Sequence, residues 1–453
     1  MKKMRKGWTV LLAACMTAAG LLSGCSSSEP ASTGSTGDAG GKKDVVHLKV
    51  WGAVPEEAGP QQVVENWNKA NPDIQVEYIR FVNDEAGNTK LETALLADGQ
   101  VDLFFGYRAD KVVKRVEAGM TEPLDQYIEK DNFNIAENFG ENSIFKFGDK
   151  IHYIPAIILN DFVGINKSYL DEAGLPIPKD WTWEEYKEYA KKLTKGEGPE
   201  KVWGSFVGGP APKIYEYVDK AVKVQLGPDI LYKQDGTSNL DHPAFKQFLD
   251  HQVEMQNELK VQPPFAEVKA TKMQGQEVYL GGKAALHWWG TASIRNIKNT
   301  KDYPHDFVTA FAPVPKFSKD DQYVTAGTGY LDFMSINTRS KHKDAAWKFM
   351  KWYVTEGNEP MIPFGRIPAW KKVDQNKVVQ MVLGENPEKL FDVESFKHVL
   401  FLDKEFIVDT KFDMMPEIQK IVEEESERTY IGEQTTEQAI ANMKKRSDGI
   451  LKK

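Results

Sequence analysis

The stretch HLKVWGAVPEEAGPQQVVENWNKANPDIQVEY, residues 47–78, decides the fold. Apolar and polar residues alternate over 47–51, as they do in a half-buried β-strand, and a loop follows. Pro60 begins a segment whose apolar residues recur with the period of a helix, and Asn71-Pro72 ends it. A second strand is predicted over 74–78. The stretch therefore predicts a strand, a helix and a further strand in succession.

The same alternation continues along the chain. A helix ending at Gly99, a continuously apolar strand over 101–105 and a helix ending at Gly119 are predicted next. Capping-box sequences at 182–185 and 435–438 predict the starts of two later helices. Strands that alternate with helices indicate an α/β fold with a parallel sheet. Because a single core rarely accommodates a chain of 453 residues, two or more lobes are expected.

The N-terminal residues resemble an export signal that ends in a lipid anchor. A basic segment at 2–6 precedes an apolar segment at 8–22, which is too short for a permanent transmembrane helix. The sequence Leu21-Leu22-Ser23-Gly24-Cys25 resembles a bacterial lipobox, in which the cysteine takes a diacylglycerol and the chain is cut before it. Residues 1–24 are therefore expected to be a signal peptide, with Cys25 lipidated; the alternative is an ordinary secretory signal. Residues 25–44, rich in serine and glycine, are expected to form a flexible tether.

Charge, cysteine and histidine content exclude several kinds of partner. The net charge is −8, and cleavage before Cys25 makes it −12, because it removes four basic residues and no acid. A chain with this negative charge is repelled by nucleic acid and by anionic lipid, and neither is expected as a partner. Only the lipid anchor is expected to contact the membrane. Cys15 is cut away and Cys25 is lipidated, so no disulfide is expected. The histidines lack metal-ligand spacing, and no metal or other cofactor is expected.

Several different short motifs follow one another along the remaining chain. They are VWG (50–52), NPDIQV (71–76), ADGQVDL (97–103), GMTEPLD (119–125), GINKSYL (164–170), GLPIPKDWTW (174–183), GGKAAL (281–286) and AAWKF (345–349). In this order they resemble the extracellular solute-binding proteins of ABC transporters, in the carbohydrate-binding family that includes maltose-binding protein. The resemblance implies a two-lobed, hinged α/β fold, each lobe a mostly parallel sheet flanked by helices, which closes on a ligand.

The resemblance also implies how the chain divides between the lobes. The N-terminal lobe is expected to comprise 45–157 and 305–357, and the C-terminal lobe 158–304 and 358–453. The chain is then expected to cross between the lobes near 157–160, 302–307 and 357–361.

The function implied by the resemblance is that of a receptor held on the extracellular face of the cell membrane. It would capture a sugar or oligosaccharide and deliver it to permease transmembrane subunits with their ATPase. The receptor itself is expected to be a monomer. No enzyme activity is expected, since HExxH, GxSxG, P-loop and GxGxxG motifs are missing from the sequence. A lipid-anchored glycosidase would need paired carboxylates, which sequence alone does not identify. An acidic, uronate-containing oligosaccharide, another non-sugar solute and a ligand-presenting sensor stay open as alternatives.

Candidate ligand residues lie mostly in loops beyond the carboxyl ends of the predicted strands, where open α/β sheets bind ligands. A sugar packs its C–H face on an aromatic ring and its hydroxyls against planar polar groups. These criteria, with turns that resemble the family's, select Trp51, Glu56, Glu57, Tyr107, Arg108, Asn160, Asp161, Trp288, Trp289, Thr328, Tyr330, Arg366 and Trp370. Arg108 has an ion pair with Asp110 as its alternative role. Trp288 and Trp289 point to opposite faces of a strand, so one of them can belong to the core.

Overall fold

The computed structural model describes residues 44–140, 143–144, 146–158, 160–208, 214–323, 329–402, 407 and 409–452. The predictions for the signal peptide, for Cys25, for the tether up to Lys43 and for Thr328 lie outside these residues. Within the described ranges, no helix combines the length and the apolar character needed to cross a bilayer.

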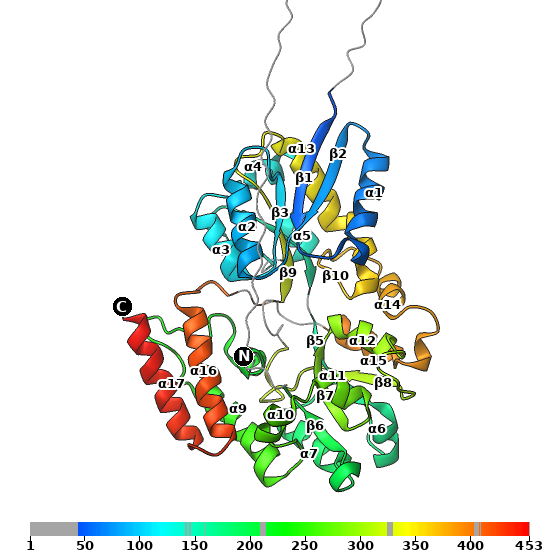
Figure 1. Cartoon of the computed structure of the whole chain (residues 1–453), viewed down its shortest axis with the longest axis vertical. Coiled ribbons are helices and arrows are strands. Elements are labelled where there is room, and N and C mark those ends of the chain that lie inside the picture. The colour runs from blue at the N-terminus through cyan, green and yellow to red at the C-terminus, as the bar shows by residue number, and fades with distance from the viewer. Residues whose placement is uncertain are drawn as a thin grey trace, which may run out of the picture. The chain divides into compact units, whose positions relative to one another are not determined.

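The first lobe is built on a six-stranded sheet with the order β10-β4-β9-β3-β1-β2 (Figure 1). Its strands are β1 (Val46–Gly52), β2 (Ile74–Arg80), β3 (Leu103–Gly106), β4 (Ile154–Ile158), β9 (Tyr330–Ile336) and β10 (Ile367–Pro368). β1 pairs in parallel with both β2 and β3, as the opening stretch of sequence predicts. β9 lies antiparallel between β3 and β4, and β10 is antiparallel to β4. The sheet is therefore mixed, because strands that return later in the chain join it in the opposite direction.

Helices cover this sheet and bury their apolar sides against it. They are α1 (Pro60–Ala70), α2 (Glu85–Leu96), α3 (Ala109–Glu117), α4 (Asp125–Lys130), α5 (Ile135–Phe139) and α13 (Lys343–Trp352). In α1, Val63 and Trp67 are buried, and the indole N–H of Trp67 donates to Ile74 O of β2 at 2.9 Å. The same ring packs edge-on against Phe349 of α13, with ring centroids 5.1 Å apart. Burial of these side chains fixes the helix to the sheet.

The second lobe is built on a four-stranded sheet with the order β6-β7-β5-β8. Its strands are β5 (Asp161–Asn166), β6 (Trp203–Phe206), β7 (Ala284–Gly290) and β8 (Thr309–Ala312). β5 is antiparallel to both β7 and β8, while β6 and β7 are parallel. Three strands thus run in one direction, with β5 opposed to them.

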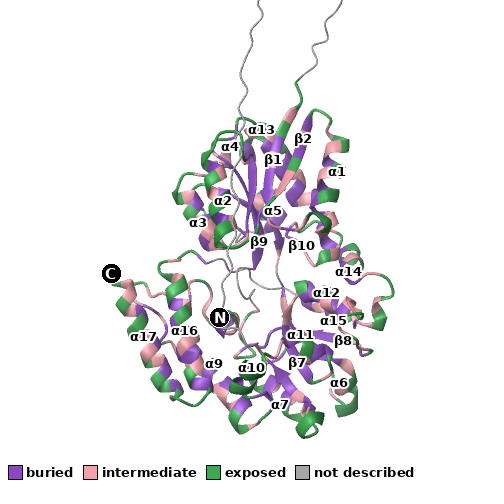
Figure 2. Cartoon of the chain, viewed as in Figure 1, coloured by how far each residue is buried: buried purple, intermediate pink, exposed green. Residues whose placement is uncertain are grey.

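Many helices surround the second sheet. They are α6 (Lys167–Ala173), α7 (Trp183–Leu193), α8 (Ile214–Leu226), α9 (Pro243–Val253), α10 (Phe265–Thr271), α11 (Gly275–Leu280), α12 (Ile294–Lys298), α14 (Gln375–Leu383), α15 (Val393–Leu400), α16 (Met415–Tyr430) and α17 (Thr436–Leu451). Both predicted capping boxes are present, at Thr182 with Glu185 and at Thr435 with Gln438. Figure 2 shows both sheets largely in the colour of buried residues, with exposed residues on the outer sides of the helices. Each lobe therefore has a core of its own.

The chain passes between the sheets at positions that differ in part from those expected. β4 ends at Ile158 and β5 begins at Asp161, so the first crossing lies between them. The second crossing lies after β8, beyond the expected 302–307, because β8 pairs with β5 in the second sheet. β10 still pairs with β4, so the first sheet also takes a strand from beyond the expected end at 357. Both differences concern short strands that add to a sheet edge.

Asp102 links three strands of the first sheet. It lies directly before β3, and its Oδ2 accepts a hydrogen bond of 2.9 Å from the backbone N–H of Lys49 in β1. Its Oδ1 accepts a 2.6 Å hydrogen bond from the Ser340 hydroxyl, and its backbone O accepts one from Asn337 N just after β9. The side chain is buried. This carboxylate therefore fixes the register at the end of the sheet opposite to the strand ends described below.

Replacement of Asp102 by alanine is expected to lower the free energy of unfolding by about 3 kcal/mol, because two hydrogen bonds to a charged acceptor are lost and two buried donors are left without partners. Urea unfolding followed by tryptophan fluorescence measures this change. The control is Asp98→Ala, which removes a mostly exposed carboxylate paired loosely with Arg339 at 3.5 Å and should change stability by less than about 0.5 kcal/mol. Equal effects of the two substitutions would contradict the assigned role.

Candidate functional site

Tyr107 lies where several strands of the first sheet end. β3 ends at Gly106, which faces Phe333 of β9, and β4 ends at Ile158, which faces Tyr330 at the start of β9. Tyr107 follows β3 directly, and its hydroxyl accepts a 2.7 Å hydrogen bond from the backbone N–H of Ala53, just after β1. The ring is half-buried. Its position is thus fixed at the sheet edge where the sequence predicts a ligand.

Arg366 lies at the same edge and has a buried partner. It directly precedes β10, whose Ile367 faces Ile158 at the end of β4. Its Nη1 donates to Oδ2 of Asp332 in β9. Asp332 is 1% exposed, whereas the Arg366 side chain is 25% exposed. Burial raises the pKa of the Asp332 carboxyl, and the guanidinium of Arg366 opposes that rise.

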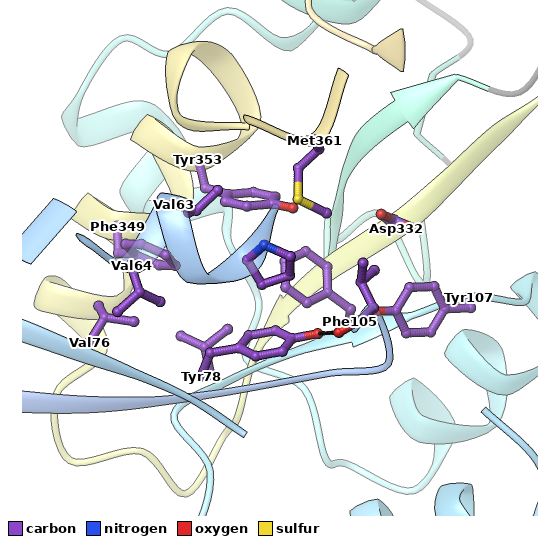
Figure 3. A pocket seen from close by; sticks show the side chains of 13 residues that line it. Val63, Val64, Val76, Tyr78, Phe105, Tyr107, Asp332, Phe349, Tyr353 and Met361 are labelled. Atoms are coloured by element: carbon purple, nitrogen blue, oxygen red, sulfur yellow. Dashed lines mark hydrogen bonds between the residues drawn. The ribbon is translucent and has the colours of Figure 1, made fainter. Parts of the chain in front are cut away.

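A small cavity of about 20 Å³ lies directly beneath these residues (Figure 3). Tyr78, Tyr107, Asp332 and Tyr353 supply the polar part of its lining, and valine, phenylalanine, proline and methionine side chains line the rest. The Tyr78 hydroxyl donates to Val54 O at 2.8 Å. The cavity has room for about one water molecule. Tyr107 and Asp332 are each held by a hydrogen bond, to Ala53 N and from Arg366 respectively, beside a cavity that is too small for a sugar.

The matching edge of the second sheet presents an aromatic ring and an ion pair. Asp161 begins β5 and faces Gly290 at the end of β7. Its Oδ1 accepts a 2.9 Å hydrogen bond from Lys220 Nζ of α8. Tyr217, three residues earlier on α8, lies over Trp288 with ring centroids 6.0 Å apart and an interplanar angle of 31°. The amphipathic helix α8 therefore supplies two side chains, Tyr217 and Lys220, that sequence reasoning missed.

The two edges approach each other. Only Asn160 and its neighbour separate the end of β4 from the start of β5. The carboxylate of Asp110 holds the pKa of Arg108 above its ordinary value, and Glu216 on α8 adds to this rise. A residue of the second lobe thus acts electrostatically on one of the first. Together the edges offer aromatic faces and planar polar groups, which suit a polyhydroxylated ligand.

Three of the predicted ligand residues are buried in this structure. Trp51 is 6% exposed, and its indole N–H donates to Gln100 O at 2.9 Å. Tyr330 is buried, and its hydroxyl donates to Phe139 O at 3.0 Å. Asn160 is buried at the first crossing, where its side-chain amide donates to Leu400 O at 3.3 Å. The donors of Trp51 and Tyr330 are thus used within the protein, whereas Asn160 Oδ1 is buried without a hydrogen-bond partner among the described residues. Their assignment to the ligand stays a prediction.

The adjacent tryptophans take different positions, as alternation on a strand requires. Trp288 is 4% exposed and packs against Trp183 and beneath Tyr217. Trp289 is half-buried on the other face, edge-on to Tyr279 at 5.1 Å. Trp288 is therefore the support of the aromatic wall, and Tyr217 covers it.

The other predicted residues are partly or fully exposed. Glu56 and Glu57 are exposed in a short helical turn after β1. Arg108 is exposed and forms the alternative ion pair with Asp110, at 2.9 Å. Trp370 is half-buried, and its indole N–H donates to Asn138 Oδ1 at 2.9 Å. Across the described residues, no group of His, Cys, Asp and Glu side chains is arranged to hold a metal ion.

Comparison with known proteins adds a family and a fold. A model of the family described as bacterial extracellular solute-binding protein matches residues 52–360. A curated relative, the maltotriose-binding protein of Pyrococcus abyssi, is 27% identical over 323 residues, which cover 69% of this chain and 64% of the relative. The chain thus matches just under two thirds of that relative's length.

Solved structures with the same fold cover most of the chain. A sugar transporter of Rhizobium etli in an open conformation is 19% identical with a TM-score of 0.73, covering 90% of this chain and 100% of that one. The sugar-binding protein MalE of Xanthomonas citri is 18% identical with a TM-score of 0.69, covering 90% and 98%. An ABC substrate-binding protein of Listeria monocytogenes in complex with cycloalternan is 21% identical with a TM-score of 0.64, covering 90% and 99%. These matches confirm the predicted two-lobed α/β fold.

His287 of β7, next to the tryptophan pair, makes the stability of the second lobe depend on pH. Its Nδ1 lies 2.9 Å from Phe206 O, and burial lowers its pKa to about 4. His251, buried against Trp183, has its pKa lowered by burial to about 3. Both histidines are therefore neutral in the folded protein at pH values where the unfolded chain already binds protons.

The free energy of unfolding should fall as the pH is lowered through about 6.5, by up to about 1.4 kcal/mol per pH unit for each of the two histidines, and level off near their folded pKa values. Urea unfolding between pH 4 and 8 measures this slope. His287→Gln keeps an N–H donor for Phe206 O but does not titrate, so it should lower the slope by up to about 1.4 kcal/mol per pH unit. His342→Gln, at an exposed position, should leave the slope unchanged. An unaltered slope in His287→Gln would contradict the prediction.

Proposed function

Because the chain belongs to the family of bacterial extracellular solute-binding proteins, we propose that it is the solute receptor of an ABC importer and that its solute is a sugar or oligosaccharide. The observation that carries the proposal is the pair of tyrosines at the two strand-end edges. Tyr107 is fixed by Ala53, and Tyr217 lies over Trp288. Aromatic faces beside Arg366 and Asp161 match the C–H faces and hydroxyls of a pyranose. The maltotriose-binding relative supports the same class of ligand.

A neutral ligand is favoured over an acidic one. The case for a uronate rested on Arg108 and Arg366, whose charges would bind its carboxylate. Each of these arginines already pairs with a carboxylate, Asp110 and Asp332 respectively. At the largely buried Arg366 site, a second carboxylate would meet a negative charge that is already in place. The proposed solute is therefore a neutral sugar or oligosaccharide.

Capture works by closure of the lobes. A ligand that contacts Tyr107 and Arg366 on one lobe and Tyr217 on the other binds the closed state more tightly than the open state, so it shifts the population toward closure. The permease then recognises the closed receptor. Lipid on Cys25 and the tether of 25–44 keep the receptor near the outer face of the membrane, where its effective concentration at the permease is high.

Isothermal calorimetry with a panel of neutral oligosaccharides, beginning with maltotriose, should show binding that Tyr217→Ala weakens at least tenfold, because the stacking face is lost. Tyr189→Ala, on α7 away from the strand ends, is the matched control and should keep the wild-type affinity. Binding of a peptide or a phosphate ester, with no sugar of the panel bound, would refute the carbohydrate assignment.

Lipid attachment has a separate test. Cys25→Ser is expected to move the protein from the membrane fraction to the medium, because no diacylglycerol can be attached. Mass spectrometry of the wild-type N-terminal peptide should show a diacylglycerol-modified Cys25. An unmodified cysteine in protein that is still exported would refute the anchor.

A further inference from the structure

We propose that Asp332 is a specificity-determining residue that adapts Arg366 to neutral sugars and excludes acidic ones. The proposal rests on the proposed function, in which Arg366 contacts the solute. It assigns the discrimination between neutral and acidic sugars to a side chain that is buried beneath the site. Sequence reasoning did not select this residue.

The backbone at Asp332 is unusual. Of the described residues other than glycine that have a positive φ, Asp332, with φ 52°, is the one that lies inside a β-strand. The left-handed region costs most residues about 1 kcal/mol, and asparagine and aspartate tolerate it best. The residue also lies where the β3–β9 ladder stops, one position before Phe333. The strand is thus bent at the position that supplies the partner of Arg366.

The carboxylate is buried with only part of its hydrogen-bonding capacity used. Oδ2 accepts from Arg366, while Oδ1 is buried and has no hydrogen-bond partner among the described residues. The rings of Tyr78, Tyr107 and Tyr353 line the cavity beside it (Figure 3). A buried carboxylate with one oxygen unpaired lowers the stability of the fold, because a buried charge needs its full set of partners. A role other than stabilising the fold would explain why it is present. Its one strong interaction is with Arg366, which points to that residue as the purpose.

The pairing with Asp332 neutralises the charge of Arg366 but leaves most of its N–H groups able to donate hydrogen bonds. A guanidinium carries five N–H donors in a rigid plane. Asp332 takes one of these at Nη1, and no other partner of Arg366 is recorded among the described residues. The remaining donors, on a side chain that is one quarter exposed, are held in a fixed orientation for ligand hydroxyls. A ligand carboxylate would meet the nearby negative charge of Asp332 with little water to screen it.

The Arg108 pair does not provide the same discrimination. Its side chain is 53% exposed, so water and salt screen both Arg108 and its partner. The selectivity between neutral and acidic solutes is therefore assigned to the buried carboxylate of Asp332.

The test is Asp332→Asn, which keeps the size of the side chain and tolerates a positive φ but carries no charge. Calorimetry compares two probes, maltotriose and the same trisaccharide oxidised at C6 of its non-reducing end to a uronate; if maltotriose does not bind, the tightest neutral sugar of the panel replaces it in both forms. The variant should weaken neutral binding about threefold and strengthen uronate binding at least tenfold. The affinity ratio then shifts about thirtyfold toward the acid.

A residue that only supported the fold would weaken both probes equally, so an unchanged ratio in folded Asp332→Asn overturns the proposal. Asp332→Gly, which also accepts the positive φ, replaces it if the asparagine variant does not fold. The matched control is Asp131→Asn, which removes another aspartate–cation pair of the first lobe, with Lys351 at 2.5 Å, and should keep the wild-type ratio. A wild-type protein that binds no neutral sugar would instead overturn the proposed function, and this inference with it.

Discussion

The antiparallel pairing of β4 with β9 is the interaction on which the rest of the structure depends. β4 carries the chain out of the first lobe and β9 carries it back, and the two strands meet at Ile158 and Tyr330. In the second lobe β5 and β8 stand in the same relation, with Val163 opposite Ala312. Both crossings therefore join neighbouring, hydrogen-bonded strands. The strand ends that carry Tyr107, Arg366 and Asp161 are gathered around those crossings for this reason.

Local sequence pattern predicted the elements that depend on local signals. The strand, helix and strand over 47–78 and the capping boxes at Thr182 and Thr435 are present as predicted. The membership of β8 was not predictable, because a four-residue apolar strand fits the edge of either sheet and its pairing is made with residues far away in the chain. The two-lobed arrangement itself came from resemblance to a family, since no periodicity indicates it.

The candidate site shows the same division. An aromatic residue near the end of a strand, such as Trp51 in β1, indicates burial as much as ligand contact, and here it is buried. Tyr217 carries no signal of its own in sequence, because it is one residue of an amphipathic helix. Arg366 was identified, but its partner Asp332 lies 34 positions earlier in the chain. Without that partner, the arginine suggested an acidic ligand, whereas the pair favours a neutral one.

The two-residue strand β10 limits how far the segment after Arg366 can move relative to β4. It follows Arg366 and pairs with the last residues of β4, Ile157 and Ile158, immediately before the first crossing. The segment that leads on to α14 of the second lobe is thereby anchored to β4. Two strands that are joined by backbone hydrogen bonds can bend together, but they resist sliding past one another because sliding would break those bonds. The β10–β4 pairing therefore resists displacement of Arg366 along the edge of the sheet, so that its guanidinium keeps its place beside Asp332.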